Sequence, residues 1–381
     1  MKKITIVHIF PDDKFFDKFA DFYDSLEGVE NRYLFYTRQR DYRFRLVKNQ
    51  GRIIIVNSFV KYIKKLRGKD VDIVLFHTMS GIKFFLATIL RNRTKVIWWS
   101  WGYDLYHSRS HMPAVIRLDM YLPFTKKLMD TLIKPESLYA RLCRNTIGRF
   151  YEVIRRRAIS RVNLLLPVCP IEYTLLKENC SYFKGGLAIY PSDEKEYPSR
   201  FFNKAGNVLV GNSLTYTNNH LDVFNRLYEV ELYDTQKFII PVNYGGDYDN
   251  PETLIRLSHF KDGSVIWLKD YLPIDEYMSI FNTVTHAVFG MIRQQAMGNI
   301  IYCLRSGVKL FLYKNSVVFK QLKEDGYVFF SIEDDLKADA LKNCLSKDDA
   351  IHNITTYNEL QKNKGSHEVL EQLKSLVNEE G

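Results

Sequence analysis

The stretch THAVFGMIRQQAMGNIIYCLRSG, residues 285–307, decides the fold class of this chain. Residues 285–292 are an apolar run typical of a buried strand, and residues 299–307 carry apolar side chains at helical spacing before a glycine. The start of a helix presents unpaired N–H groups and a partial positive charge. We therefore expect the turn between strand and helix to bind an anion, and a diphosphate fits best. Its candidate ligands are Arg293, Gln294, Gln295, Gly298 and Asn299.

Strand-like and helix-like segments alternate along the rest of the chain. Apolar runs rich in Ile, Val, Phe and Trp, such as residues 4–10, 72–78 and 95–101, are each followed by a segment of helical period. This alternation is typical of parallel sheets that are covered by helices. A polar segment at 191–206, which contains two prolines and shows neither period, separates the chain into two halves.

The pattern predicts an α/β fold of two Rossmann-like doubly wound domains facing across a cleft, the GT-B architecture of glycosyltransferases. With 381 residues, of which 46% are hydrophobic, the chain can form two cores. We expect an N-terminal acceptor-binding domain at 1–190, a linker at 191–206 and a C-terminal nucleotide-sugar-binding domain at 207–365. A last helix at 366–381 is expected to cross back to the first domain.

Basic residues outnumber acidic residues, 54 to 44, and the net charge of +10 favours an anionic partner. Residues 117–161 hold eleven Lys or Arg and four Asp or Glu, so most of the excess lies there. Five cysteines without a C-x-x-C pair indicate neither a disulfide framework nor a zinc site, and they fit a reducing cytoplasm. The apolar runs are too short to span a bilayer, so any membrane contact is expected to be peripheral.

Two further loops of the second domain follow predicted strands. Their candidate residues are Gly211, Asn212, Ser213, Asn219, His220 and Tyr244. Ligands of doubly wound folds gather at this carboxyl edge of the sheet, so we expect these residues to bind the donor nucleotide, with Tyr244 packing on a base or sugar. The alternative is purely local structure, in which Gly211 serves a tight turn and an asparagine caps the helix.

An Asp-x-Asp pattern occurs at Asp247 and Asp249. In the other large glycosyltransferase architecture, GT-A, two such carboxylates hold a divalent cation on the diphosphate. A three-residue pattern is weak, and solvated acids of a turn explain it better. We therefore expect no metal and no cofactor, only a nucleotide-sugar donor.

In the first domain, WWSWGYD at 98–104 places three of the four tryptophans and a carboxylate at a strand end. Aromatic rings stack on sugars, and a carboxylate can accept a proton from an attacking hydroxyl. We expect an acceptor site here, with Trp99, Trp101 and Tyr103 contacting the saccharide and Asp104 as general base. The alternative is an aromatic core in which Asp104 caps the next helix.

Two histidines, His8 and His77, also stand at the carboxyl ends of predicted strands. We expect them to line the acceptor site, with His77 as second candidate for the base. A hydrogen-bonded structural role is the alternative for each histidine.

The insertion at 126–161 combines basic and apolar residues. Its apolar residues at roughly helical spacing are Leu138, Leu142, Ile147, Phe150, Tyr151 and Ile154, and its arginines include Arg141, Arg144, Arg155, Arg156 and Arg157. A basic amphipathic helix of this kind can lie on an anionic membrane surface. Two alternatives stay open: a helix packed on its own domain, and a surface for the phosphate backbone of nucleic acid, although no nucleic-acid motif accompanies the charge.

Four segments together resemble one known family. They are IWWSWGYDLY, LVGNS followed by NNH, IIPVNYGG and RQQAMGNIIYCLRSGVKLFLYKN, in this order along the chain. The set is similar to the TDP-N-acetylfucosamine:lipid II N-acetylfucosaminyltransferases, which are family 56 glycosyltransferases, also called 4-α-L-fucosyltransferases. The matching positions are Gly102, Asp104, Gly211, Asn212, Ser213, Asn219, His220, Pro241, Tyr244, Arg293, Gln294, Gln295 and Gly298.

The resemblance implies transfer of an N-acetylfucosamine-like deoxy-aminosugar from a dTDP donor to a polyprenyl-diphosphate-linked saccharide. The implied place is the cytoplasmic face of the bacterial inner membrane, during surface polysaccharide assembly. One alternative is another donor, such as GDP-fucose, or a non-lipid acceptor in capsule or lipopolysaccharide synthesis. A more distant alternative is a nonenzymatic protein that binds polyanions or membranes through its basic segment.

Overall fold

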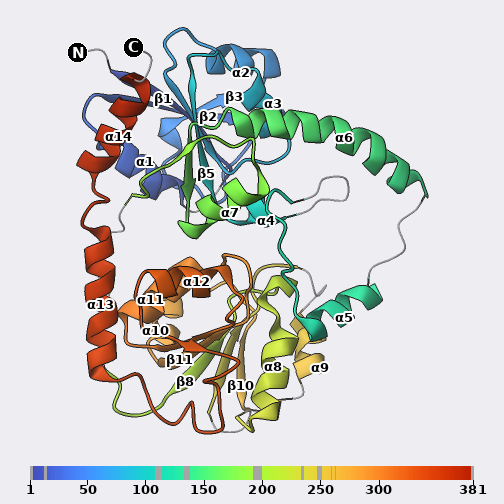
Figure 1. Cartoon of the computed structure of the whole chain (residues 1–381), viewed down its shortest axis with the longest axis vertical. Coiled ribbons are helices and arrows are strands. Elements are labelled where there is room, and N and C mark those ends of the chain that lie inside the picture. The colour runs from blue at the N-terminus through green and yellow to red at the C-terminus, as the bar shows by residue number, and fades with distance from the viewer. Residues whose placement is uncertain are drawn as a thin grey trace. The chain divides into compact units, whose positions relative to one another are not determined.

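The computed structural model describes residues 3–12, 15–107, 114–132, 138–191, 200–232, 236–246, 251–258, 260–261 and 263–378, with the backbone alone for 138–145 and Ile274. The chain forms two compact units, each of which carries one parallel sheet (Figure 1). Unit 1 comprises Met1–Arg117, Glu136–Asp193 and Gln361–Gly381, and unit 2 comprises Leu118–Pro135 and Glu194–Leu360.

Unit 1 is built on seven parallel strands in the order β3-β2-β1-β4-β5-β6-β7. The strands are β1 (Ile4–Ile9), β2 (Val29–Tyr36), β3 (Ile53–Val56), β4 (Ile73–His77), β5 (Lys95–Ser100), β6 (Leu164–Pro167) and β7 (Gly186–Leu187). The helices are α1 (Phe16–Asp24), α2 (Phe59–Leu66), α3 (Ile82–Thr88), α4 (Tyr103–Tyr106), α6 (Leu138–Ser160), α7 (Ile171–Asn179) and α14 (Ser366–Asn378). This strand order is that of a doubly wound Rossmann fold, whose switch point lies between β1 and β4.

One core of unit 1 lies between its sheet and helices α1 and α14 (Figure 1). Alternate side chains of the strands face this core because successive residues of a strand point to opposite sides. Its members include Ile6, Ile73 and Leu75 of the sheet, Phe16 and Phe19 of α1, and Val369, Leu373 and Leu376 of α14. The last helix of the chain is therefore part of unit 1.

Unit 2 repeats the same topology with six parallel strands in the order β10-β9-β8-β11-β12-β13. The strands are β8 (Asn207–Val210), β9 (Phe238–Pro241), β10 (Val265–Leu268), β11 (Val284–Phe289), β12 (Lys309–Leu312) and β13 (Phe330–Ser331). The helices are α5 (Pro123–Leu132), α8 (His220–Glu229), α9 (Pro251–Ser258), α10 (Ile274–Phe281), α11 (Met297–Arg305), α12 (Val317–Glu324) and α13 (Lys347–Gln361). Every residue of β11 is buried, as expected for a strand that is covered on both faces.

Helix α5 belongs to unit 2 because α8 satisfies its free N–H groups. The carboxylate of Asp222 accepts hydrogen bonds from the N–H groups of Phe124 (2.9 Å) and Thr125 (3.0 Å). The side chain of Asn219 accepts another from the N–H of Leu122 (2.9 Å). The sequence pattern placed this segment in the first domain, and these long-range bonds are why it lies in unit 2 instead.

Candidate functional site

In unit 2, the loops that follow β8 and β11 start at the switch point of the sheet, where the two strands are neighbours. Gly290 brings the two loops into contact: a Cβ added there would lie 2.3 Å from the carbonyl oxygen of Asn218. The side chain of Asn219 reinforces the contact, since its amide donates to the carbonyl of Gly290 at 2.8 Å. The predicted loops at 211–220 and 293–299 are thus brought together.

Gln295 joins these loops through a network of side chains. Its amide nitrogen donates to Oδ1 of Asn212 at 2.9 Å and more weakly, at 3.3 Å, to the hydroxyls of Ser213 and Thr215. Its amide oxygen accepts from the hydroxyl of Thr217 at 2.7 Å. Both ends of Gln295 are therefore used inside the protein, which fixes the turn that leads into α11.

Asn218 and Asn219 hold the first loop from within. Asn218, 1% exposed, donates to the carbonyl of Ser213 and to the hydroxyls of Ser213 and Thr215, each at 2.9 Å. Asn219 adopts a left-handed backbone (φ 49°) and is fully buried, and its side chain bonds only main-chain groups. These two residues shape the loop, and the side-chain amides of both bond to groups of the protein.

Gly211 and His220 pack against each other at the start of the loop. Gly211 has φ +66°, and a Cβ there would lie 2.6 Å from Nε2 of His220. Burial lowers the pKa of His220 to about 3, so the imidazole is neutral at pH 7. Both residues therefore have a structural place next to the expected nucleotide pocket.

Arg293 and the first turn of α11 present the groups suited to an anion. Helix α11 begins at Met297, two residues before the start predicted from the sequence, and no side chain among the described residues caps its first N–H groups. A Cβ added at Gly298 would meet nothing within 4 Å, so the helix start is open. Arg293 is half-buried and donates from Nη1 to the carbonyl of Gln294 at 2.8 Å.

Two further side chains border this turn. Gln294 is 5% exposed, and its amide oxygen has no hydrogen-bond partner among the described residues. Asn299 donates to the hydroxyl of Tyr277 at 3.2 Å, which anchors the first turn of α11 to α10. A buried hydrogen-bond acceptor without a donor lowers the stability of the folded state, so a ligand or a water molecule is expected to donate to the amide oxygen of Gln294.

Tyr244, in the loop after β9, completes this group of residues. Its hydroxyl accepts a hydrogen bond from the amide of Asn212 at 2.6 Å, while 54% of the residue is exposed. Burial raises the pKa of Tyr244, and the hydrogen bonds with Asn212 and Ser213, followed by the charge of Arg293, oppose that rise. The ring thus presents a free surface beside the Asn212–Gln295 network, as a nucleotide base or sugar would need.

In unit 1, Asp104 is held by three hydrogen-bond donors. Its Oδ2 accepts from the indole of Trp98 (2.7 Å) and the N–H of Met79 (2.9 Å), and its Oδ1 accepts from the N–H of Trp101 (2.9 Å). The side chain is 6% exposed, and burial raises its pKa. This environment favours the structural alternative, in which Asp104 fixes the turn between β5 and α4.

The aromatic residues of that turn are divided between core and surface. Trp99 is 7% exposed and packs edge to face with Trp101, with ring centroids 6.2 Å apart. Tyr103 is 38% exposed. Of the expected acceptor contacts, Tyr103 is therefore the one that presents most of its surface to solvent.

His8 and His77 form a buried relay with Asn31. Nδ1 of His8 lies 3.2 Å from Nε2 of His77, and Nε2 of His8 lies 3.0 Å from Oδ1 of Asn31. The amide oxygen only accepts, so His8 donates from Nε2 and accepts from His77. Nδ1 of His77 is then a lone-pair acceptor, and it has no partner among the described residues.

Burial keeps both imidazoles of this relay neutral. It lowers the pKa of His8 to about 4 and the pKa of His77 well below 6.5, where the second ring and Lys83 add to the effect. The ring of Trp99 lies 4.8 Å from that of His77, and its indole nitrogen is also buried without a partner in the described part of the chain. Nδ1 of His77 and the indole nitrogen of Trp99 are thus two polar atoms at this sheet edge that a ligand or a water molecule could bind.

Lys83 was missed by the sequence patterns. Its ammonium donates to the carbonyl of His77 (2.6 Å) and the hydroxyl of Thr78 (2.9 Å), and burial lowers its pKa to about 8, opposed by Asp104. The signal that could have revealed it was its position in the first turn of α3, the helix that follows β4. Asn31, Thr215 and Thr217 were missed as well, because polar residues of strands and loops carry no motif.

The basic insertion forms two helices, α5 in unit 2 and α6 in unit 1. The side chains of Leu138, Leu142, Arg141 and Arg144 lie outside the described residues, as do Asp247 and Asp249. Arg155 is 6% exposed and paired with Glu152, so it does not face a membrane as expected. Arg156 and Arg157 are exposed.

No helix in the described part of the chain is long and apolar enough to cross a membrane.

The predicted apolar row of α6 is divided between two sides. Tyr151 packs on Phe84 of α3, with ring centroids 5.9 Å apart, and Ile154 is half-buried. Ile147 and Phe150 are 56% and 70% exposed. The helix therefore docks on its own unit with one side and shows apolar side chains to solvent with the other.

Solved structures of other proteins share this fold along the whole chain. A glycosyltransferase from Rickettsia africae is 12% identical, with a TM-score of 0.60 over 100% of this chain and 99% of that chain. A UDP-forming α,α-trehalose-phosphate synthase from Burkholderia xenovorans is 9% identical, with a TM-score of 0.56 over 99% of each chain. The N-terminal domain of a Candida albicans trehalose-6-phosphate phosphatase is 10% identical, with a TM-score of 0.60 over 99% of this chain and 96% of that chain.

At such low sequence identity these similarities show the fold alone. They confirm the predicted GT-B architecture. The family is shown by a different comparison. The family model for the 4-alpha-L-fucosyltransferases, glycosyl transferase group 56, matches residues 140–362, more than half of the chain, and includes the loops at 211–220 and 290–299. The chain therefore belongs to the 4-alpha-L-fucosyltransferase family, glycosyl transferase group 56, and is a glycosyltransferase of the GT-B fold.

Proposed function

We propose that unit 2 binds a dTDP-linked deoxy-aminosugar, N-acetylfucosamine or a close relative, and that the sugar is transferred to a polyprenyl-diphosphate-linked saccharide bound by unit 1. The observation that carries the donor assignment is the convergence of three features at the carboxyl edge of the sheet: Arg293, the first turn of α11, and the exposed ring of Tyr244, which Asn212 and Gln295 link to that turn. The sugar and nucleotide are taken from the family resemblance.

In this proposal the leaving diphosphate is stabilised without a metal ion. The guanidinium of Arg293 offsets its charge, and the N–H groups near Gly298 and Asn299 donate hydrogen bonds to its oxygens. The Gln295 network holds these donors in place before the substrate arrives, so little reorganisation is needed as the bond to the sugar breaks.

For the acceptor, we assign the general base to Nδ1 of His77 and not to Asp104. The carboxylate of Asp104 already accepts three hydrogen bonds, whereas Nδ1 of His77 holds an unused lone pair. An acceptor hydroxyl that reached Nδ1 would supply the missing donor, and Asn31 and His8 would keep the required tautomer. Asp104 and Lys83 then act as positioning residues for the strand ends.

A thermal-shift screen of nucleotides tests the donor assignment. Ligands that bind only the folded protein raise the unfolding temperature more the more tightly they bind, so dTDP should stabilise the protein more than UDP or GDP at equal concentration. A larger shift with GDP would favour the alternative donor, GDP-fucose. No shift with any nucleoside diphosphate would refute the donor site.

A further inference from the structure

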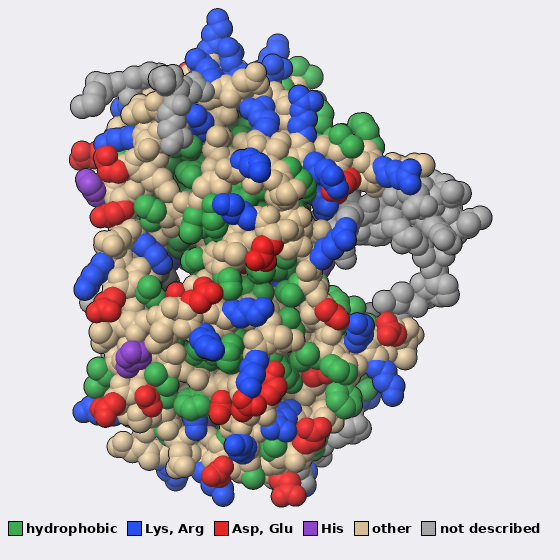
Figure 2. Space-filling model, in the orientation of Figure 1, with side chains coloured by type: hydrophobic (Ala, Val, Ile, Leu, Met, Phe, Trp, Pro, Cys, Tyr) green, Lys and Arg blue, Asp and Glu red, His purple; other side chains and the backbone are tan. Residues whose placement is uncertain are grey.

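The positive charge of this chain lies in unit 1. Unit 1 contains 34 Lys or Arg and 20 Asp or Glu, whereas unit 2 contains 20 Lys or Arg and 24 Asp or Glu. On the face that Figure 2 shows, basic side chains (blue) gather over the surface of unit 1. Unit 1 binds the acceptor in the proposed function, so its charge favours an acceptor that carries anionic groups.

Part of this charge is concentrated in the loop that follows β2. Residues 38–48, the basic loop, carry one acidic side chain, Asp41, and five basic ones: Arg38, Arg40, Arg43, Arg45 and Lys48. All six are exposed. None of the five cations has an ion pair within the described residues, and the one side-chain hydrogen bond that they make is a long contact of 3.5 Å from Nε of Arg38 to the hydroxyl of Tyr36. The basic loop thus presents cations that the described part of the protein does not neutralise.

Two carboxylates hold the backbone of the basic loop. Asp12 accepts hydrogen bonds from the N–H groups of Arg45 (2.8 Å) and Leu46 (3.1 Å). Asp17 accepts from the N–H groups of residues 48 and 49, at 2.9 and 2.8 Å. Both acids lower the local positive charge, but together with Asp41 they number three against the five cations of the loop. The loop is therefore fixed and remains basic.

Apolar side chains of the same loop anchor it in the core of unit 1. Phe44 and Val47 are 8% and 4% exposed and belong to the core that α1 and α14 cover. Arg43, Arg45 and Lys48, which flank them in the sequence, are exposed. The loop therefore directs its apolar residues inward and its cations to solvent, which positions the cations before a ligand arrives.

The basic loop lies at the same edge of the sheet as the candidate acceptor site. Strand β2 pairs with β1 in parallel, so the loop leaves the sheet beside the end of β1, which carries His8. Asp12, which holds the loop, also follows β1, and Phe15 packs edge to face on Trp101, with ring centroids 5.8 Å apart. The ring of Trp101 in turn lies 6.4 Å from that of His77, the proposed base. A saccharide bound at His77 would thus have the basic loop on the side of β1 and β2.

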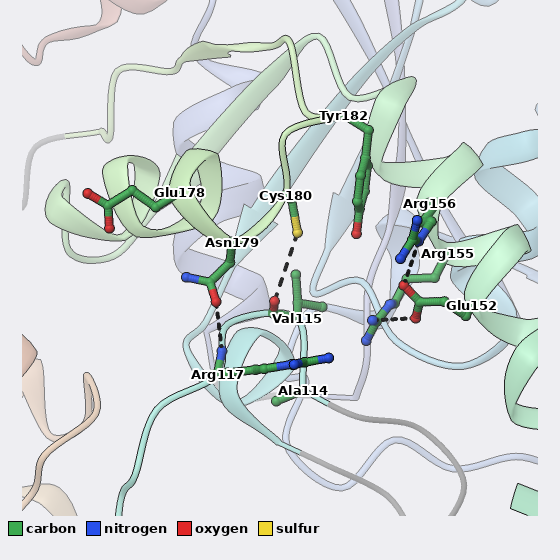
Figure 3. Close-up of a pocket in the computed structure, with 10 residues that line it drawn as sticks. All are labelled: Ala114, Val115, Arg117, Glu152, Arg155, Arg156, Glu178, Asn179, Cys180 and Tyr182. Atoms are coloured by element: carbon green, nitrogen blue, oxygen red, sulfur yellow. Dashed lines mark hydrogen bonds and ion pairs between the residues drawn. The ribbon is translucent and has the colours of Figure 1, made fainter. Parts of the chain in front are cut away.

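A cavity of about 350 Å³ in unit 1 is lined by arginines as well, but its charges are largely matched inside the protein (Figure 3). Glu152 pairs with Arg155 and, at 3.0 Å, with Nε of Arg156. Glu178 also lines the cavity and adds a second negative charge. The exposed cations of the basic loop are therefore the better site for an anion.

We propose that the basic loop binds the diphosphate of the acceptor, an inference that rests on the proposed polyprenyl-diphosphate-linked saccharide. Four of the five cations are arginines, whose planar guanidinium groups bind phosphate oxygens in a bidentate way. The exposed position fits as well, because a diphosphate that is attached to a membrane-embedded chain reaches a surface loop more readily than the interior of a domain. The donor diphosphate is assigned to unit 2, so the two anions have separate sites.

Calorimetric titration of geranyl diphosphate, a water-soluble prenyl diphosphate, tests this proposal on the full-length protein. Excess dTDP is present throughout to fill the proposed donor site. The double variant Arg43→Gln with Arg45→Gln is compared with the wild type and with the double variant Arg67→Gln with Lys69→Gln. Arg67 and Lys69 are exposed cations between α2 and β4, at the opposite edge of the same sheet, and they serve as the matched control. We expect binding to weaken roughly tenfold or more in the loop variant and to stay near wild type in the control.

Equal losses in the two double variants, or no binding of geranyl diphosphate by the wild type, would overturn the proposal. Flotation with phosphatidylglycerol vesicles distinguishes an acceptor diphosphate from the phosphates of a membrane surface. If the loop variant lost vesicle binding and kept its affinity for geranyl diphosphate, the loop would be a membrane contact and the proposal would be wrong.

Titration of dTDP alone separates this proposal from the donor assignment. We expect the loop variant to bind dTDP as the wild type does. A weaker dTDP affinity in the loop variant would assign the loop to the donor and overturn the proposal, whereas a wild type that binds geranyl diphosphate but not dTDP would refute the donor site alone.

Discussion

The hydrogen bond between Gln295 and Thr217 should couple the two loops of the candidate donor site. Its length is 2.7 Å, and the amide of Gln295 makes a second good bond, 2.9 Å, to Asn212. Each such bond contributes about 1 kcal/mol net, and the buried side chains of Thr217 and Asn212 left without this partner add to the loss. We therefore expect Gln295→Leu to lower the free energy of unfolding by about 2–3 kcal/mol and Thr217→Val to lower it by about 1 kcal/mol.

A double-mutant cycle isolates that bond. Urea unfolding of the wild type, both single variants and the double variant should give a coupling energy of about 1 kcal/mol, because the second change removes a bond that the first has already broken. The same four proteins should show weaker dTDP binding whenever Gln295 is replaced, since the turn before α11 loses its anchor. Additive effects, with a coupling below about 0.3 kcal/mol, would refute the view that this network holds the site together.

Three further predictions concern other parts of the molecule. Asp104→Asn should destabilise the protein by about 2 kcal/mol or more, since an amide N–H would face one of three donors. His77→Gln should also lower the stability, because the buried ring bonds His8 and packs on Trp99, but the protein that stays folded should show kcat about 10²-fold lower, a loss that Asp104→Asn should not share; the reverse pattern of kcat would return the base to Asp104. The pKa of His220 is about 3 in the folded protein, so between pH 6.5 and 3 only the unfolded state binds a proton at this residue. The contribution of His220 should therefore lower the free energy of unfolding by about 1.4 kcal/mol for each pH unit of acidification in this range. Urea titrations at several pH values should show a slope that is smaller by that amount in His220→Gln. Gly290→Ala should cost about 2 kcal/mol or more because its Cβ would overlap a backbone oxygen, while Gly298→Ala, in open space, should change the unfolding midpoint little; equal effects would contradict the loop contact.

Most of the architecture could be predicted from periodicity. The runs at 4–10, 72–78, 95–101 and 285–292 form β1, β4, β5 and β11, because strands buried on both faces leave continuous apolar stretches in the sequence. The loops at 211–220 and 293–299 could be placed together because parallel strands deliver their carboxyl ends to one edge. The family resemblance at those same loops is confirmed by the match over residues 140–362.

The side-chain partners within the site could not be predicted in this way. Asp104 faces either an acceptor saccharide or three internal hydrogen-bond donors, and the outcome depends on the positions of Met79 and Trp98 in the folded chain. No local sequence pattern indicates those positions. The same holds for the Asn31 acceptor that sets the tautomer of His8, and for Asp222, which draws α5 into unit 2. These contacts join residues far apart in the chain, so only the folded structure reveals them.

Calorimetric titration of dTDP into the wild type, Arg293→Gln and Arg305→Gln tests the central claim most directly. Arg293 lies in the turn before α11, whereas Arg305 is the last residue of that helix, with its guanidinium over the ring of Tyr357 at 4.2 Å. A charge-assisted bond to the diphosphate predicts that Arg293→Gln weakens dTDP binding by roughly 10- to 100-fold, with Arg305→Gln close to wild type. Wild-type affinity in Arg293→Gln would contradict the assignment of this turn as the donor diphosphate site.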